Sequence, residues 1–330
     1  MSKSIFITGA TGFVGAAMVR HFAALGHPVL ATSRSTAPPR LLDVAQYHQA
    51  DLTRPLASIS AEVVVHAAAL ASDAAAWTDL ARANLDGTRH VYEATRNCPC
   101  FVYISSSSVY DPRRAMHTED EPVETSLLSP YGRSKYLAEQ WLLEQDWTGR
   151  SLYILRPRAI YGPGDRVLLP RLMRLVRGGR IVSPGSMAVQ SSLTHVGNLC
   201  QAVMACVQHH QPGTRIFNVA DAQPYAMNAV VQRLLSDIYG QPLDFLPLPL
   251  GPLRAVARVL YTLGLARQFT PQSLAAVSAD STLNTRKIGE MMGFEPHFDF
   301  WNSAGEIANW AKTVGIERVK NADSDLCWSC

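Results

Sequence analysis

Residues 8–15 read Thr-Gly-Ala-Thr-Gly-Phe-Val-Gly, and this stretch decides the fold. A short apolar run at residues 5–8 leads into it, and a run of small and apolar residues at 16–25 predicts a helix after it. The first glycine allows a tight turn, the second lets the backbone approach a pyrophosphate, and the third lets the helix pack closely on the strand. Free N–H groups at the helix start favour phosphate charge. The stretch therefore predicts a dinucleotide-binding loop, formed by the residues Gly9, Thr11, Gly12, Phe13, Val14 and Gly15.

The end of the next predicted strand, residues 29–32, indicates which dinucleotide binds. A carboxylate there would bind the ribose 2′-hydroxyl of NAD, but the sequence continues with Ser33 and Arg34. A hydroxyl and a guanidinium can accommodate the additional 2′-phosphate of NADP. We therefore expect NADP as the cofactor, with NAD as the alternative if Arg34 stacks on the adenine or faces solvent.

Strand and helix patterns alternate after this loop, which predicts an α/β fold. Continuous apolar strand patterns recur at residues 63–66, 101–105 and 152–155, and helical patterns lie between them at 80–96 and 131–145. Right-handed crossovers between such strands build a Rossmann-type, doubly wound parallel sheet.

Proline and glycine become frequent after residue 160, so we expect a second lobe. Residues 1–160 are predicted to form an NAD(P)-binding Rossmann domain, and residues 161–330 a smaller C-terminal substrate-binding lobe. Part of 195–220 is expected to return to the first domain, because 215–219 has a strand pattern. Apolar residues suit either a hydrophobic substrate or the core of this lobe: Leu168, Leu169, Leu172, Met173 and Met187.

Composition and charge argue against several classes of protein. The 330 residues carry a formal net charge of +3 without a long basic run, which disfavours a nucleic-acid or membrane partner. The most apolar late stretch, 245–265, is interrupted by prolines and arginines, which disfavours a bilayer span. The N-terminal apolar run is too short for a signal peptide, so we expect a cytoplasmic protein. The ten histidines lack metal-ligand spacing, so we expect a small-molecule substrate and no metal.

Two cysteines near the C-terminus, Cys327 and Cys330, have the spacing of a redox or metal-ligand pair. No second pair stands at zinc-finger spacing, and no helix start follows. We therefore expect two unreactive thiols on a frayed tail.

A phenol and an ammonium group indicate the chemistry. Tyr131 and Lys135 would share one face of the helix predicted at 131–145. A nearby ammonium lowers the pKa of a phenol, which can then act as general acid or base on a carbonyl or alcohol. The serines at 105–108 follow a buried strand, where one hydroxyl can hydrogen-bond the substrate oxygen. The sequence contains no G-x-S-x-G, so a serine hydrolase is not indicated.

With these motifs the chain resembles the extended short-chain dehydrogenase/reductase superfamily, and within it the NAD-dependent epimerase/dehydratase family. The resemblance runs nearly from end to end. Further motifs that carry it are Asp51-Leu52, His-Ala-Ala-Ala at 66–69, Asn-Leu-Asp-Gly-Thr at 84–88, Arg156-Pro157 and Tyr-Gly-Pro-Gly-Asp at 161–165.

The resemblance implies a role for each matching residue. It gives Tyr131 the acid/base role, Ser106 the catalytic serine position, and Lys135 the binding of the nicotinamide ribose. Asn84 would support the site. The remaining matches would line the cofactor: Asp51 and Leu52 at the adenine, Ala67, Ala68 and Ala69 along its length, and Pro157 near the nicotinamide.

The branch of the superfamily decides the reaction. Dehydratases have an Asp-Glu pair where this chain has Ser107 and Ser108, so dehydration is disfavoured. Sugar-nucleotide epimerases usually carry a diphosphate-binding arginine at the position of Ser191. Residues 192–198 are more similar to the 3β-hydroxysteroid dehydrogenase-like branch, although Gly197 replaces its usual aspartate. Residues 247–265, 269–271 and 287–296 also resemble that branch, and some sugar-nucleotide 4-ketoreductases share these features.

We therefore expect an NAD(P)-dependent ketoreductase or alcohol dehydrogenase. The alternatives are a sugar-nucleotide epimerase or 4-ketoreductase, and a non-catalytic dinucleotide-sensing protein on the same fold. The helices at 84–96 and 131–145 resemble the pair that forms the dimer interface in this superfamily, which favours a homodimer. Trp141 and Leu142 would then face either a partner or the interior of the monomer.

Overall fold

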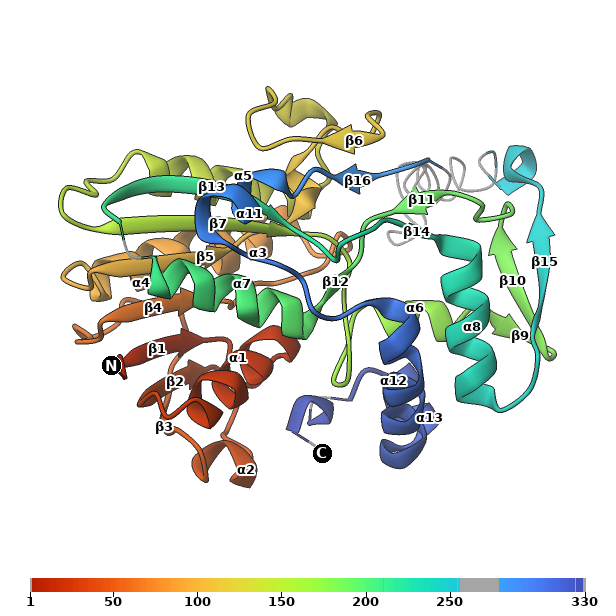
Figure 1. Cartoon of the computed structure of the whole chain (residues 1–330), viewed down its shortest axis with the longest axis horizontal. Coiled ribbons are helices and arrows are strands. Elements are labelled where there is room, and N and C mark those ends of the chain that lie inside the picture. Colours follow the sequence, from red (N-terminus) through yellow and green to blue (C-terminus); the bar gives the residue numbers. More distant parts are fainter. Residues whose placement is uncertain (1, 210, 254, 256–278, 324, 329–330) are drawn as a thin grey trace.

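The central sheet of the chain has seven strands. In the computed structural model, which describes residues 2–209, 211–253, 255, 279–323 and 325–328, the strand order is β13-β7-β5-β4-β1-β2-β3 (Figure 1). All neighbours in this sheet are parallel. The strands span β1 Ile5–Thr8, β2 Val29–Ser33, β3 Gln46–Gln49, β4 Val63–His66, β5 Cys100–Ile104, β7 Ser151–Pro157 and β13 Gly213–Val219. The predicted Rossmann-type parallel sheet is confirmed.

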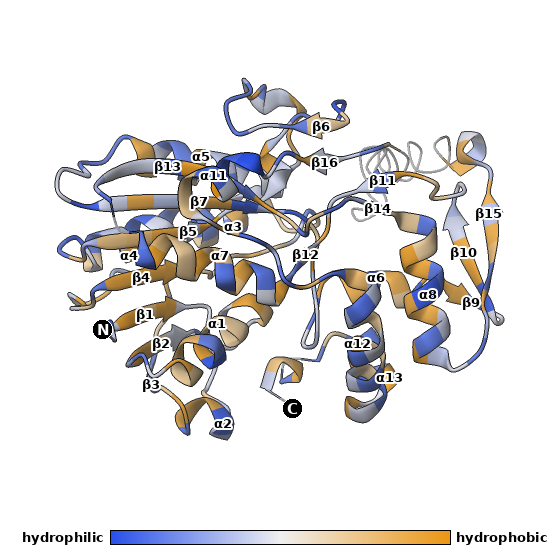
Figure 2. Cartoon of the chain, in the orientation of Figure 1, coloured by the Kyte–Doolittle hydropathy of each residue, from blue (hydrophilic) through white to orange (hydrophobic). Residues whose placement is uncertain are grey.

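Apolar side chains on both faces explain why these strands lie inside the molecule. Every residue of β1, β4 and β5 is buried, and Figure 2 shows β1 and β4 coloured as hydrophobic. Helices α1 (Phe13–Ala24) and α7 (Val196–Gln208) pack with one face of the sheet. Helices α4 (Gly87–Ala94) and α5 (Pro130–Leu143) pack with the other face.

The helix expected at 80–96 is divided into three parts. A short α3 (Trp77–Leu80) leads into a π-helical turn at Ala81–Asp86, and α4 follows. Such wide turns are rare and occur often at functional sites. Here the π-helical turn contains Asn84, which is 1% exposed.

The lobe formed after β8 (Ile160–Tyr161) has its own core. Its helices are α6 Leu168–Met173, α8 Met227–Tyr239, α12 Phe300–Val314 and α13 Ile316–Lys320. A three-stranded sheet, absent from the sequence-based expectation, has the order β15-β10-β9, with β9 Val176–Arg177, β10 Arg180–Pro184 and β15 Asp244–Leu248. The apolar residues that suited either a hydrophobic substrate or the core of this lobe belong to the core: Leu169, Leu172, Met173 and Met187 are buried, and Leu168 packs against them. They hold the lobe together.

Short strand pairs connect distant parts of the chain. They are β8 with β12 (Thr194–His195), β11 (Gln190–Ser191) with β14 (Tyr225–Ala226), and β6 (Met116–His117) with β16 (Thr282–Leu283). The remaining helices are α2 (Pro39–Leu42) and α11 (Arg286–Met292). Within the described ranges, no helix combines the length and apolar character needed to cross a bilayer.

The C-terminal segment is packed rather than frayed, which corrects the expectation for Cys327. Cys327 and Trp328 are buried in the same apolar cluster as Phe13. The Trp328 indole N–H donates to the Ala10 carbonyl at 3.0 Å, and the Arg20 guanidinium lies 5.1 Å from the indole centroid. Trp328 therefore stabilises the glycine loop, although it lies 318 positions after Ala10 in the sequence. Cys330 lies outside the described residues.

Candidate active site

The glycine loop has no room for side chains at its critical points. Gly9 has φ +72°, and a Cβ there would lie 2.9 Å from the Ala68 backbone. A Cβ on Gly15 would overlap the carbonyl oxygen of Gly9. Helix α1 starts after Gly12 without a side-chain cap and without an acidic residue in its first turn. Its free N–H groups, those of Phe13 and Val14 included, therefore fit the pyrophosphate of a dinucleotide.

The end of β2 is tied to this loop by hydroxyl groups. The Ser33 hydroxyl bonds to Thr11 Oγ1 at 2.8 Å and to the Tyr47 hydroxyl at 2.9 Å. Ser33 is therefore engaged in bracing the loop, whereas Arg34 is exposed. Of the two residues expected at the 2′-position, only Arg34 presents its side chain to solvent.

The loop after β4 lies directly behind the glycines. The Ala68 N–H donates to Thr8 Oγ1 at 3.1 Å, and the same hydroxyl bonds to His66 Nδ1 at 2.7 Å. His66 is fully buried, and burial lowers its pKa to about 3. Ala67 and Ala68 thus come within contact distance of Gly9, and Ala69 continues the same loop.

Asn84 is fully engaged in hydrogen bonds. Its Oδ1 accepts the Leu70 N–H at 2.7 Å, and its Nδ2 donates to the Leu70 carbonyl at 3.2 Å and to Ser134 Oγ at 2.8 Å. It therefore joins the loop after β4 to helix α5.

The two residues expected at the adenine lie in one turn. The Asp51 carboxylate accepts the Thr53 N–H at 3.0 Å, and this bond lowers the Asp51 pKa. The Leu52 carbonyl accepts a hydrogen bond from His90 at 2.8 Å.

Ser106, Tyr131 and Lys135 meet at the carboxyl end of β5. Ser106 starts the turn Ser107–Val109, and its hydroxyl donates to Ser108 Oγ and accepts the Ser108 N–H, both at 3.1 Å. The same hydroxyl lies near enough to the Tyr131 phenol to help lower its pKa. Lys135 Nζ donates to the Ile104 carbonyl at 2.7 Å and lies 4.1 Å from the Tyr103 ring centroid. Residues from two segments therefore lie close together at this end of the sheet, and their catalytic roles stay predictions.

The electrostatics of this group differ from the expectation. Burial raises the pKa of Tyr131 to about 12, and the nearby Ser106 hydroxyl only partly opposes that rise. Burial also lowers the pKa of Lys135 to about 7, although Glu139 opposes the change. The predicted acidification of the phenol by the ammonium is therefore wrong for this state of the site. Tyr131 is a protonated phenol at neutral pH, suited to donate a proton.

A buried ion pair that was not predicted from the sequence lies next to Lys135. Arg156 Nη2 lies 2.5 Å from Glu139 Oε2, and the two side chains are 3% and 0% exposed. Glu139 stands one helical turn after Lys135, and Arg156 lies within the fully buried strand β7. An arginine inside an apolar strand pattern signals a buried partner, and this was the available clue.

A second missed residue is Gly132. A Cβ there would overlap the Ser108 carbonyl oxygen, because α5 lies directly against the serine turn. This close approach sets the separation between Tyr131 and Ser106.

We expect Gly132→Ala to destabilise the fold by roughly 1–3 kcal/mol, because the new methyl group must push α5 away from the turn. The kcat/KM of the folded enzyme should also fall, because Tyr131 moves with helix α5. Gly305→Ala is the matched control: Gly305 also lies within a helix, and no atom of the described residues lies within 4 Å of the position that a Cβ would take there. The control should gain up to about 1 kcal/mol. Denaturant unfolding measures the free energy of unfolding, and steady-state kinetics measure kcat/KM. The prediction would be contradicted if Gly132→Ala and Gly305→Ala gave the same values of both quantities.

Comparisons with known proteins show which family the chain belongs to. The model of the family "NAD dependent epimerase/dehydratase family" matches residues 5–220. A 2-alkyl-3-oxoalkanoate reductase of Stenotrophomonas maltophilia is 30% identical over 73% of this chain and 77% of its own length. A UDP-glucose 4-epimerase of Vibrio cholerae is 29% identical over 76% of this chain and 80% of its own.

Solved structures show the same fold. MoeE5 in complex with UDP-glucose and NAD aligns with a TM-score of 0.73 at 23% identity, over 94% of this chain and 99% of its own. The chain belongs to the NAD-dependent epimerase/dehydratase family of the extended short-chain dehydrogenases/reductases, and it is an NAD(P)-dependent oxidoreductase.

Proposed function

We propose that the chain is a ketoreductase in which Tyr131 is the general acid. A bound nicotinamide would supply the hydride that adds to the carbonyl carbon. The Tyr131 phenol gives its proton to the carbonyl oxygen, which Ser106 holds by a hydrogen bond, and the product is a secondary alcohol. The supporting observation is that α5 packs directly against the serine turn through Gly132, so the Tyr131 phenol lies beside Ser106 at the end of β5.

The other residues have binding and positioning roles in this proposal. Lys135, held at the end of β5 by the Ile104 carbonyl, binds the nicotinamide ribose. Pro157 is the last residue of β7 and therefore lies at the carboxyl end of the sheet. We expect it to border the nicotinamide there. Asn84 keeps α5 in place through Ser134. The loop of Gly9–Gly15, with Asp51, Leu52 and Ala67–Ala69, holds the rest of the dinucleotide.

We further propose that the substrate carries an oxo group on an aliphatic chain. The 2-alkyl-3-oxoalkanoate reductase is 30% identical to this chain, and its name describes such a compound. The experiment is a screen of 3-oxo acids and esters against nucleotide sugars with NADPH. Consumption of NADPH with the oxo compounds alone is the expected result.

NADP is the proposed cofactor because Arg34 is exposed at the end of β2. We expect Arg34→Ala to lower the preference for NADPH over NADH by roughly 10- to 100-fold, since a charge-assisted bond to the 2′-phosphate is lost. Arg40→Ala on α2 is the control and should leave the ratio unchanged. Equal loss of affinity for both nucleotides in Arg34→Ala would contradict the prediction.

A sugar-nucleotide epimerase or 4-ketoreductase is the second candidate. Its support is the alignment with MoeE5 and the 29% identity with the Vibrio cholerae epimerase. An epimerase retains NAD through its cycle, so the nucleotide released from freshly purified, denatured protein separates the candidates. Stoichiometric NAD would favour the epimerase, and empty protein that binds NADPH would favour the reductase.

A homodimer in the cytoplasm is the proposed state of the protein. Leu142 is fully buried within the monomer, so it does not face a partner. Trp141 is half-buried against Tyr92 on the outer side of α4 and α5, and it supports an interface there. Light scattering after gel filtration, and cell fractionation, test the two parts of this proposal.

A further inference from the structure

Arg158 lies close to the proposed catalytic group. It directly follows Pro157, the last residue of β7. The Ser105 N–H donates to the Leu155 carbonyl at 2.8 Å, which brings the ends of β5 and β7 level with each other. Ser106 therefore lies opposite the end of β7, one or two residues from Arg158.

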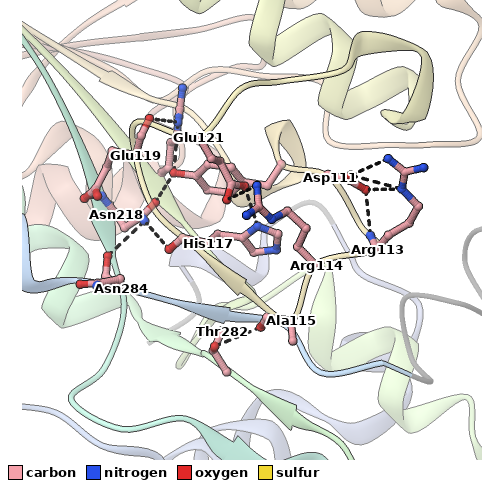
Figure 3. A network of polar contacts seen from close by, with 12 residues as sticks. Asp111, Arg113, Arg114, Ala115, His117, Glu119, Glu121, Asn218, Thr282 and Asn284 are labelled. Atoms are coloured by element: carbon pink, nitrogen blue, oxygen red, sulfur yellow. Dashed lines mark hydrogen bonds and ion pairs between the residues drawn. The ribbon is translucent and has the colours of Figure 1, made fainter.

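The side chain of Arg158 lies near His117. Arg156, two residues earlier, lies 4.9 Å from the Tyr110 ring centroid. His117 stacks on that ring at 4.8 Å, and Arg158 is near enough to His117 to help lower its pKa, after burial as the main cause. Figure 3 shows His117 within the polar segment that follows the serine turn. Arg158 therefore lies close to this segment.

No carboxylate neutralises Arg158 within the described part of the chain. Its Nε donates to Ser191 Oγ at 3.1 Å, and the ion pairs found there do not include it. It is half-buried, and burial lowers its pKa to about 10. By contrast, the neighbouring Arg156 is paired with Glu139. A half-buried cation without a counter-ion costs free energy, which is typical of a ligand-binding position.

Nearby acidic groups are engaged elsewhere. Glu121 lies 2.8 Å from His117 Nδ1 and 3.7 Å from Arg114 Nη1, as part of the network in Figure 3. Glu119 accepts the Asn218 N–H at 2.8 Å. Among the described residues, the two terminal nitrogens of Arg158 therefore have no carboxylate partner and can form the fork that binds a carboxylate through two bonds.

We propose that Arg158, supported by Ser191, binds a carboxylate of the substrate and so makes the enzyme select oxo acids over neutral ketones. This rests on the proposed ketoreductase function. One guanidinium beside one hydroxyl matches the single charge of a carboxylate. The diphosphate of a nucleotide is the other anion that Arg158 could bind, and the experiment therefore includes UDP as a competing ligand.

The test uses the stable reaction partners, 3-hydroxydecanoate and its methyl ester, oxidised with NADP. Wild-type enzyme should prefer the acid by its kcat/KM. In Arg158→Gln, kcat/KM for the acid should fall roughly 10- to 100-fold and that for the ester by less than about threefold, because only the acid loses a charge-assisted bond. Arg158→Lys keeps the charge but loses the fork, and it should give an intermediate value. Arg113→Gln is the control, because Arg113 is already paired with Asp111 at 2.8 Å, and its acid-to-ester ratio should match wild type.

Measurements of Kd test the role of Arg158 independently of the proposed ketoreductase activity. Binding is measured in the Tyr131→Phe variant and in the double variant that also carries Arg158→Gln, so that no turnover is needed. The Kd of the acid should be higher in the double variant, and the Kd of the ester should be the same in both. An equal change for acid and ester would overturn the inference. Tighter, Arg158-dependent binding of UDP than of the acid would also overturn it. Failure of the wild type to oxidise either compound would instead count against the proposed function.

Discussion

Replacing Tyr131 with phenylalanine is expected to lower kcat/KM for ketone reduction by roughly 10²- to 10⁴-fold, the usual contribution of a positioned proton donor. The phenylalanine ring keeps the packing of α5 but removes the hydroxyl that lies beside Ser106. The Kd for NADPH should therefore change little. Steady-state kinetics and fluorescence titration with NADPH measure the two quantities separately.

Tyr239→Phe is the matched control for this substitution. Tyr239 ends helix α8 in the other lobe, and no role in binding or catalysis is assigned to it. Its kcat/KM should match wild type. If Tyr131→Phe retained turnover as high as the control does, Tyr131 would not be the proton donor.

Glu139→Ala is expected to destabilise the protein by about 3–5 kcal/mol, because it leaves a buried guanidinium without its counter-ion. Arg156 is 3% exposed and relies on Glu139: burial alone would lower the Arg156 pKa, yet the carboxylate raises it above its ordinary value. Denaturant unfolding gives the free-energy difference directly.

An exposed pair provides the comparison. Arg286 and Glu290 form an ion pair with side chains 80% and 58% exposed, so Glu290→Ala should cost at most about 1 kcal/mol. A cost for Glu139→Ala as small as that for Glu290→Ala would show that the buried pair does not hold α5 to β7.

The sequence predicted those parts of the fold that depend on local pattern. The bounds expected for β1 and β4 agree with the structure, because a continuous apolar run between turn residues defines a strand buried on both faces. Strand β3 was missed since Gln46–Gln49 is polar and mostly exposed at the sheet edge. Strand β15 was missed for a similar reason: it is largely exposed and contains Pro247.

The candidate site divides in the same way. The glycine loop and the spacing of Tyr131 and Lys135 are local and could be predicted, although their roles stay predictions. The contacts that set the geometry join distant segments: Gly132 against Ser108, Glu139 with Arg156, and the indole of Trp328 on the Ala10 carbonyl. A single sequence carries no pattern for such pairs. The pKa of Tyr131 was also misjudged, because desolvation depends on burial that only the folded chain reveals.

Transfer of a deuterium label tests the central claim most directly. The enzyme is incubated with a 3-oxo ester and NADPH that carries deuterium at the transferable position of the nicotinamide. Hydride transfer predicts one deuterium on the new carbinol carbon and one NADP formed for each alcohol, with both lost in Tyr131→Phe. Recovery of unchanged NADPH and unlabelled ester, while a nucleotide sugar is interconverted without net redox change, would contradict the account.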